Sequence, residues 1–310
     1  MKKACWLVLA MVCAVSFSKV RLALNWKPEP QFGGFYAAVV EKLIQEKQID
    51  LEILPGGSGT PTAQMVAAGT VELGVSSADS IVIARDRGMP VTALMAVYQN
   101  NPHGIMTHAE RGFKHIGDVF EKPGTVSLQR GMAYSLFLEK RFGFKNVRIV
   151  PYAGGVANFL ADPGLSQQCF VTSEPLLAKR QGQNPKTFLV AEAGFNPYTT
   201  VLVARQDWID ANPKLVATMV TVFREGWRRY LADPTKTNER MHQLNPTMDL
   251  ATFLESAQAQ KTLILSGDAL TSGVGAMTDQ RWQDISGQLK DLGLIQKTFS
   301  PKTYYWVPPG

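Results

Sequence analysis

A strand–turn–helix unit near the amino terminus most constrains the fold of this chain. Residues 20–24 form a short apolar strand, and prolines at positions 28 and 30 bring it to an end. Apolar residues then recur with the i, i+3, i+4 spacing of a helix packed on a sheet, at positions 32, 35, 36, 39, 40, 43 and 44. The pattern predicts an α/β unit, with a helix over residues 32–44.

Asn25 and Trp26 lie in the turn between this strand and this helix. In open α/β sheets, ligands bind beyond the carboxyl ends of the strands. An asparagine amide offers both a donor and an acceptor, and an indole offers a flat face, which together suit a planar, polar small molecule. The alternative role for Trp26 is to cover the edge of the core.

The same alternation of strands and helices continues along the chain. Further strands are predicted at residues 49–54, 71–75, 91–98, 124–128, 147–150, 168–172 and 200–204. A polar connector at residues 99–104 separates two such series and is a candidate hinge. The tail is helical, with helices predicted from the Asn212 cap to Asp233, over residues 250–264, and from residue 278 onward. Two α/β lobes with mostly parallel sheets are therefore expected.

Residues 1–18 have the features of a secretory signal peptide. A Met-Lys-Lys start precedes an apolar run over residues 4–15, and Ser16 and Ser18 place small residues at −3 and −1 of a cleavage site. A lipoprotein anchor at Cys13 is disfavoured, because residues 10–12 lack the leucine and small residues that such a site prefers. Export would leave Cys169 as the single cysteine, without an intramolecular disulfide and buried in an apolar run. We expect a soluble periplasmic protein.

The patterns of common catalytic and metal sites are missing. The four histidines, at positions 103, 108, 115 and 242, form no His-Glu-x-x-His motif, and no Gly-x-Ser-x-Gly elbow occurs. The formal net charge of +6 comes from scattered basic residues that are not interleaved with aromatic ones, so no nucleic-acid partner is expected. These features favour a binding protein over an enzyme, with no catalytic residues, no metal and no cofactor.

Candidate binding residues follow the predicted strands. One turn joins a strand to a helix amino terminus, where an anion or a carbonyl oxygen is well received. Another carries Glu174, whose carboxylate could accept two N–H bonds from an aminopyrimidine or ammonium-like ligand, or could simply favour the start of a helix. Serines cap a third helix, and tyrosines fall in the first helix and near the proposed hinge and cleft turns. The full set of candidates is Asn25, Trp26, Tyr36, Ser76, Ser77, Tyr98, Gln129, Arg130, Gly131, Met132, Tyr152, Glu174 and Tyr198.

Taken in order, several of these segments resemble one protein family. They are Asn-Trp-Lys-Pro at residues 25–28, Gly-Gly-Phe-Tyr at 33–36, Gly-Thr-Val-Glu-Leu-Gly at 69–74, Thr-Ser-Glu-Pro at 172–175, Gly-Phe-Asn-Pro-Tyr at 194–198 and Gly-Ala-Met-Thr-Asp-Gln-Arg-Trp at 275–282. The chain resembles solute-binding proteins of ABC transporters, in the subfamily that handles thiamine-pyrimidine precursors, alkanesulfonates and related solutes. The resemblance covers nearly the whole mature chain.

The resemblance implies a type II periplasmic binding protein fold with a ligand cleft between two lobes. Lobe 1 would comprise residues 19–102 and 200–310, and lobe 2 residues 103–199, with hinges near 99–104 and 192–200. Trp26 would match the stacking tryptophan of the family, Glu174 its cleft acid, and residues 129–132 the helix-start turn that receives ligand oxygens. The partners would be a small-molecule ligand and an ABC permease in the inner membrane, and we expect a monomer.

Two ligand classes and three other functions stay open. Trp26 and Glu174 favour an aminopyrimidine precursor of thiamine, whereas Arg130 and the serines at positions 76 and 77 suit a sulfonate or another small anion. The fungal thiamine-pyrimidine synthases of the same family are single-turnover enzymes with a cysteine-rich motif, which this chain lacks. Cytoplasmic transferases share the fold, but the signal peptide disfavours that role. A sensory or adaptor module that docks to a receptor is the third alternative.

Overall fold

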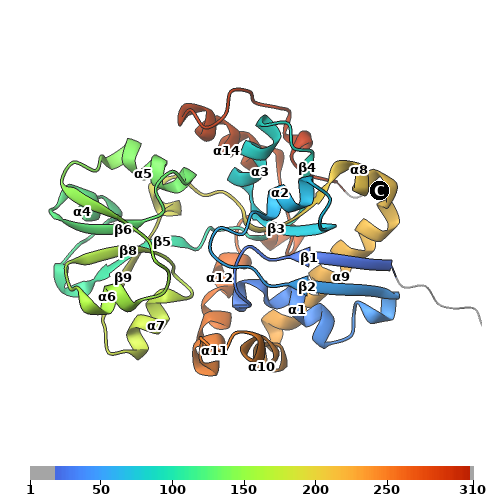
Figure 1. Cartoon of the computed structure of the whole chain (residues 1–310), viewed down its shortest axis with the longest axis horizontal. Helices are drawn as coiled ribbons and strands as arrows, with labels where there is room; N and C mark the ends of the chain where they lie inside the picture. Colours follow the sequence, from blue (N-terminus) through green and yellow to red (C-terminus); the bar gives the residue numbers. More distant parts are fainter. Residues whose placement is uncertain (1–17, 308–310) are drawn as a thin grey trace, which may run out of the picture.

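The computed structural model describes residues 18–307 and contains two five-stranded sheets, each flanked by helices (Figure 1). The first sheet takes its strands from two separate parts of the sequence, whereas the second comes entirely from the middle of the chain. The predicted signal peptide and Cys13 lie outside the described residues, except for Ser18. Within residues 18–307, no helix has both the length and the apolar character needed to span a membrane.

The first sheet has the strand order β2-β1-β3-β10-β4. Its strands are β1 (Ser18–Ala23), β2 (Ile49–Leu54), β3 (Leu73–Ser77), β4 (Val91–Tyr98) and β10 (Thr199–Arg205). Strand β1 pairs in parallel with β2 and β3, and β10 runs antiparallel between β3 and β4. The antiparallel strand is the one that returns from the second sheet.

Helices cover both faces of the first sheet (Figure 1). On one face, α1 (Gly33–Val40) and α9 (Pro213–Ala232) pack against the apolar side of the strands; α2 (Thr62–Ala67), α3 (Ala78–Asp86) and α14 (Asp279–Asp291) cover the other. The remaining segments of this part are η1 (Pro30–Phe32), η2 (Gln45–Lys47), α8 (Gln206–Ala211), α10 (Thr235–Leu244), α11 (Leu250–Ala259), α12 (Lys261–Ile264), α13 (Ala269–Ser272) and η5 (Pro301–Thr303).

The second sheet repeats this plan with the order β7-β6-β8-β5-β9. Its strands are β5 (His103–His108), β6 (Gly124–Leu128), β7 (Val147–Pro151), β8 (Leu165–Phe170) and β9 (Pro185–Leu189). The accompanying helices are η3 (Ala109–Arg111), α4 (Ile116–Glu121), α5 (Ala133–Phe142), α6 (Ala157–Ala161), α7 (Glu174–Arg180) and η4 (Ala191–Ala193). Strand β6 is parallel to β7 and β8, while β5 is antiparallel to β8 and β9. The predicted α/β class with two helix-flanked sheets is confirmed, but both sheets are mixed instead of mostly parallel, because β10 and β5 run antiparallel to their neighbours.

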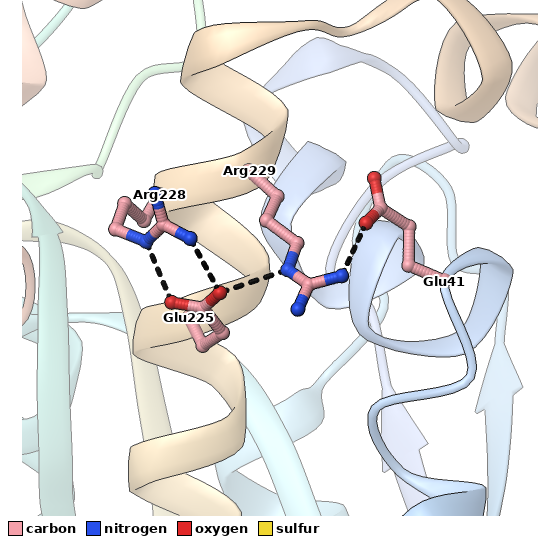
Figure 2. Close-up of polar contacts among 4 residues, drawn as sticks. All are labelled: Glu41, Glu225, Arg228 and Arg229. Atoms are coloured by element: carbon pink, nitrogen blue, oxygen red, sulfur yellow. Dashed lines mark hydrogen bonds and ion pairs between the residues drawn. The ribbon is translucent and has the colours of Figure 1, made fainter.

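The helix pair α1 and α9 forms the centre of the first core. The Phe35 ring meets the Phe223 ring edge-on at 5.0 Å and the Trp227 ring at 5.9 Å. Near the ends of these helices, Glu225 accepts hydrogen bonds from Arg228 and Arg229, and Arg229 also reaches Glu41, just after α1, at 2.8 Å (Figure 2). Apolar packing and a surface ion network therefore both join α9 to α1.

Three sequence-based expectations about these elements are wrong. The first helix ends at Val40 instead of residue 44, because Lys42 takes a left-handed backbone conformation with φ 61°. The apolar residues at positions 43 and 44 are still buried, so the apolar spacing of the sequence extends beyond the end of the helix. The connector predicted at residues 99–104 is shorter, since β5 begins at His103. The helix predicted over residues 250–264 is divided at Gln260 into α11 and α12.

Candidate functional site

A cavity of about 520 Å³ lies between the two sheets and is lined by both. From the first sheet it receives the turn after β1 and the junction of β3 with α3. From the second it receives the turns that follow β6, β7 and β8. These are the carboxyl ends of parallel strands, the position at which α/β sheets bind ligands. A cavity of this volume suits a small molecule.

Nine of the candidate residues line this cavity, and the structure thus brings together segments that are far apart in the sequence. They are Asn25, Trp26, Ser76, Ser77, Gln129, Gly131, Met132, Tyr152 and Glu174. Their contact with a ligand stays a prediction.

The other four candidates lie away from the cavity lining. The exposed Arg130 side chain turns outward to Glu139, with 3.4 Å between the charged groups. Tyr98 is fully buried and donates its hydroxyl to Gln260, and the Tyr198 hydroxyl donates to Asp268 at 2.8 Å. The Tyr98 hydroxyl therefore stabilises the first lobe, and that of Tyr198 fixes the segment before β10 to the C-terminal part of the chain.

Tyr36, the fourth of these candidates, lines a separate groove between α1, β2 and α10. Tyr36 belongs to α1, and the buried side of this helix packs against α9 and α10. Of the four tyrosine candidates, Tyr152 alone lines the cavity, because a large aromatic ring in a helix or near a turn also fills the core.

Glu174 is the first residue of α7 and is held from two sides. Its Oε1 accepts from the Tyr152 hydroxyl at 2.8 Å, and its Oε2 accepts from the backbone N–H of Phe170 at 2.8 Å. Burial raises the pKa of this carboxyl above its ordinary value, with the hydrogen bonds opposing the shift. A carboxylate has about four lone-pair positions. The side chain is only partly covered, so it can accept further N–H groups from a ligand.

Glu29 is a cavity residue that the sequence analysis did not identify. It is only 8% exposed, and it accepts from the Trp26 indole N–H at 3.2 Å and from the Ser173 hydroxyl at 3.5 Å. Burial and then the nearby charge of Glu174 raise the pKa of Glu29 to about 8. The available signal was a carboxylate between two prolines, at positions 28 and 30, in a turn that leads into an apolar helix.

Gln168, Tyr134 and His103 are further cavity residues that the sequence analysis did not identify, and they line its second-lobe side together with Gln129. Gln168 on β8 accepts the backbone N–H of Gln129 at 2.7 Å and the hydroxyl of Tyr134, and it donates to the Gln129 side chain at 3.2 Å. The His103 ring lies 4.1 Å from the Tyr134 ring, and burial lowers the pKa of His103 to about 4, so the ring is neutral at pH 7. A glutamine in an otherwise buried strand near its carboxyl end was the available signal.

The part of the cavity lining that belongs to β3, α3 and β10 contains hydroxyl groups and one residue with a strained backbone. Ser77 donates to Ser80 at 3.0 Å at the start of α3, and burial raises the pKa of the neighbouring Asp79. Thr200 lines the cavity with φ 51°, at a bulge in β10. A left-handed conformation is costly for a β-branched residue. Over residues 18–307, no group of three metal-ligating side chains is present.

Comparison with solved structures shows the fold. The periplasmic aliphatic sulphonate binding protein SsuA from Escherichia coli superposes with a TM-score of 0.72 at 13% identity, covering 95% of this chain and 94% of that one. The chain therefore has the periplasmic binding protein fold, as predicted.

Three sequence relatives carry different names. The riboflavin-binding protein RibY of Chloroflexus aurantiacus is 23% identical, over 90% of this chain and 82% of that protein. The 4-amino-5-hydroxymethyl-2-methylpyrimidine phosphate synthase THI5 of Saccharomyces cerevisiae is 22% identical, over 91% and 85%. The formylaminopyrimidine-binding protein of Halalkalibacterium halodurans is 19% identical, over 76% and 72%. Since the model of the family described as NMT1/THI5 like matches residues 29–237, more than half of the chain, this protein belongs to the NMT1/THI5-like family.

Proposed function

We propose that this protein is the extracytoplasmic solute-binding component of an ABC importer. The observation that carries the proposal is the cavity between the sheets, which is lined by Trp26 from the first lobe and by the hydrogen-bonded Tyr152–Glu174 pair from the second. The protein would be exported by its signal peptide and act as a periplasmic monomer. Its lobes, residues 19–102 with 200–310 and residues 103–199, would close by bending near 99–104 and 192–200. The closed form would deliver the ligand to an inner-membrane permease.

The ligand we propose is a planar nitrogen heterocycle, most specifically a thiamine pyrimidine precursor of the hydroxymethyl- or formylamino-pyrimidine type. The indole face of Trp26 offers a stacking surface, and Glu174 offers acceptors for an exocyclic amino group. The amides of Gln129 and Gln168 add donors and acceptors in the same cavity. Relatives named for binding riboflavin and formylaminopyrimidine support this ligand class.

A small organic anion such as an alkanesulfonate is the second candidate. Arg87, which follows α3, lines the cavity and supplies one cationic group, with the hydroxyls of Ser76 and Ser77 near the start of that helix. Two observations weigh against it. Arg130, the arginine that favoured an anion in the sequence, turns away to Glu139. Two carboxyl groups, Glu29 and Glu174, also line the cavity and would repel an anion.

The test is thermal unfolding of residues 19–310 against hydroxymethyl- and formylamino-pyrimidines, thiamine, riboflavin, taurine, longer alkanesulfonates and nitrate. A ligand at about 100 times its Kd adds about 2.7 kcal/mol to the free energy of unfolding. An upward shift with pyrimidines supports the proposed importer role. A shift with sulfonates alone assigns the protein to the anion class, and no shift with any compound contradicts the proposed ligand classes.

The same samples separate binding from the synthase activity of some relatives. A binding protein releases its ligand chemically unchanged and keeps its own mass. A single-turnover synthase that consumes one of its side chains would change in mass as product appears. Mass spectrometry of the protein and of the released compound therefore distinguishes the two functions, and an altered protein mass would contradict the proposal.

A further inference from the structure

We propose that Glu29 and Glu174 act as a carboxylate pair that makes the cavity selective for a positively charged or proton-carrying ligand. This inference rests on the proposed function, because it takes the cavity to be the ligand site. It goes beyond that function by adding Glu29 as a specificity-determining residue and by fixing the charge of the ligand. Without a cation beside it, the pair holds one negative charge, and one of the two carboxyls keeps its proton.

The two carboxyl groups reach the cavity from opposite lobes. Glu29 lies between β1 and α1 of the first lobe, and Glu174 begins α7 of the second. The Glu29 carboxyl accepts from the hydroxyl of Ser173, the residue that directly precedes Glu174. The contact crosses the cleft, so closing the lobes brings the two acids into one dry environment.

The surroundings offer little positive charge to this pair. Across residues 18–307, neither acid takes part in an ion pair. Lys27 is exposed and only weakly favours the charged form of Glu29. The groups beside the pair, Tyr98, Tyr152 and Cys169, are neutral at pH 7 because burial raises each pKa. His103, which lines the same cavity, is neutral as well because burial lowers its pKa.

The other charged groups of the cavity do not supply the missing charge. Asp79 is a further acid whose burial favours the protonated form, and Arg87 is exposed to solvent. Two neighbouring carboxylates, one buried and one half-buried, cannot both ionise without a cost. A ligand with a protonated ring nitrogen or an amidine group would remove that cost, since its positive charge would lie between the two carboxylates. A neutral ligand leaves the cost in place, and an anionic ligand increases it.

The first arm of the test needs no ligand. The native pKa of Glu29 is about 8, above its ordinary value of 4.5, so the folded protein binds more protons than the unfolded chain between these values. The contribution of Glu29 to stability is therefore complete below pH 4.5 and is lost as the pH rises through 8. The unfolding temperature of the wild type should fall across pH 5–8.5 more steeply than that of Glu29→Gln, which cannot ionise.

Two variants make this arm decisive. Glu46→Gln removes an exposed carboxylate far from the cavity lining and should follow the wild type. Glu174→Gln removes the neighbouring charge and should move the fall to lower pH. If the unfolding temperatures of the wild type and Glu29→Gln change in parallel with pH, the proposal that Glu29 and Glu174 act as a pair is wrong. If Glu29→Gln does not fold, the shift caused by Glu174→Gln decides the matter alone.

The second arm uses three planar probes of nearly equal shape: benzamidine, benzamide and benzoate, measured by titration calorimetry at pH 7.5. Benzamidine should bind at least tenfold more tightly than benzamide and benzoate should bind weakest. Glu29→Gln should reduce the benzamidine preference about tenfold, with Glu46→Gln unchanged. Equal affinities, or a preference for benzoate, would overturn the inference. If no probe binds, the ligand-free curves decide.

The two arms also separate this inference from the proposed function. If pyrimidines stabilise the protein but Glu29→Gln alters neither the pH dependence of the unfolding temperature nor the preference for benzamidine, the importer role is supported and the carboxylate pair is contradicted. If no pyrimidine binds but benzamidine is preferred and Glu29→Gln abolishes the preference, the pair stands and the ligand belongs to another cationic class.

Discussion

The indole N–H of Trp26 is bonded to Glu29, and this bond fixes which part of the ring a ligand can meet. With its only donor occupied by Glu29, the indole can contribute only its apolar ring surface to the cavity that it lines. Glu174 is fixed in the same way by Tyr152 and by the N–H of Phe170. For the ligand that we propose, these groups would already be oriented, which would reduce the entropy cost of binding.

At the residue scale we predict that Trp26→Ala and Glu174→Ala each weaken ligand binding at least tenfold, a loss of about 1.4 kcal/mol or more. The first removes the stacking face and the second removes the acceptors for N–H groups. Titration calorimetry with the compound found by the thermal screen measures both. Arg130→Ala is the matched control outside the cavity and should bind like the wild type. Wild-type affinity in Trp26→Ala or Glu174→Ala would refute that residue's assignment.

How far the sequence predicted the site depends on the kind of residue. Polar groups directly after a strand, such as Gln129 and Glu174, were predictable, because the carboxyl ends of parallel strands meet at one edge. Tyrosines were less predictable, because a ring near a turn can fill the core as readily as contact a ligand. Tyr152 lines the cavity, whereas Tyr98 and Tyr198 are buried outside it. Glu29 could not be predicted from its own segment, because its contact with the second lobe is made through Ser173, which is 144 residues away.

At the element scale, the contact between α1 and α9 depends on two glycines that let the helices approach. A Cβ added to Gly226 would lie 2.3 Å from the carbonyl oxygen of Gly34, and one added to Gly34 would lie 2.1 Å from the Trp227 ring. In the first case the obstacle is backbone, which cannot move aside without separating the helices. This pair carries the turn with Trp26 and Glu29, since that turn leads directly into η1 and α1.

We predict that Gly226→Ala lowers the free energy of unfolding by about 2 kcal/mol or more, because overpacking at a backbone contact forces the helices apart. Gly287→Ala in α14 is the matched control. That glycine is exposed, and an added Cβ there meets open space, so the better helix propensity of alanine should raise stability by about 0.5–1 kcal/mol. Urea unfolding measures both. Equal effects of the two substitutions would contradict the close contact.

The ion network in Figure 2 predicts a difference between two neighbouring arginines. Arg229 joins Glu225 on α9 to Glu41 beyond α1, whereas Arg228 contacts Glu225 within the same helix. Arg229→Ala should therefore lower the unfolding temperature at pH 7 more than Arg228→Ala does. Hydrogen bonds from both arginines lower the pKa of Glu225 to about 2. Its contribution is present above about pH 4.5 and is lost as the pH falls toward 2, so the difference should shrink in acid. A difference that is as large at pH 2 as at pH 7 would exclude the ionic origin.

The sequence predicted the order of most elements because alternating strand and helix patterns are local. It predicted less well where the structure depends on distant partners. Strand β5 has polar residues at both ends and becomes a strand between β8 and β9, both of which come later in the chain. The antiparallel direction of β5 and β10 likewise follows from the two crossings between sheets, which no single segment encodes.

At the scale of the whole molecule, polar contacts join the two lobes on both sides of the cavity. On one side Arg180, at the end of α7, pairs with Glu255 on α11 at 3.0 Å and lies 3.9 Å from Asp249. On the other side Lys140 on α5 donates to the backbone carbonyl of Asp291, which ends α14, at 2.6 Å. Such contacts exist only while the lobes are together, so they favour the closed form over an open one.

We therefore predict that Arg180→Ala shifts the protein toward an open form without unfolding it. A partly exposed ion pair contributes about 0.2–1 kcal/mol, so the ligand affinity should fall at most about fivefold, and mainly through faster dissociation. Stopped-flow dissociation rates and the radius of gyration from solution scattering measure the shift. Arg205→Ala is the matched control, because its ion pair with Asp207 lies within one lobe and should leave both quantities unchanged. High salt should reduce the difference between Arg180→Ala and the wild type, since it screens the same pair. An Arg180→Ala protein that releases ligand at the wild-type rate would show that the pair does not hold the lobes closed.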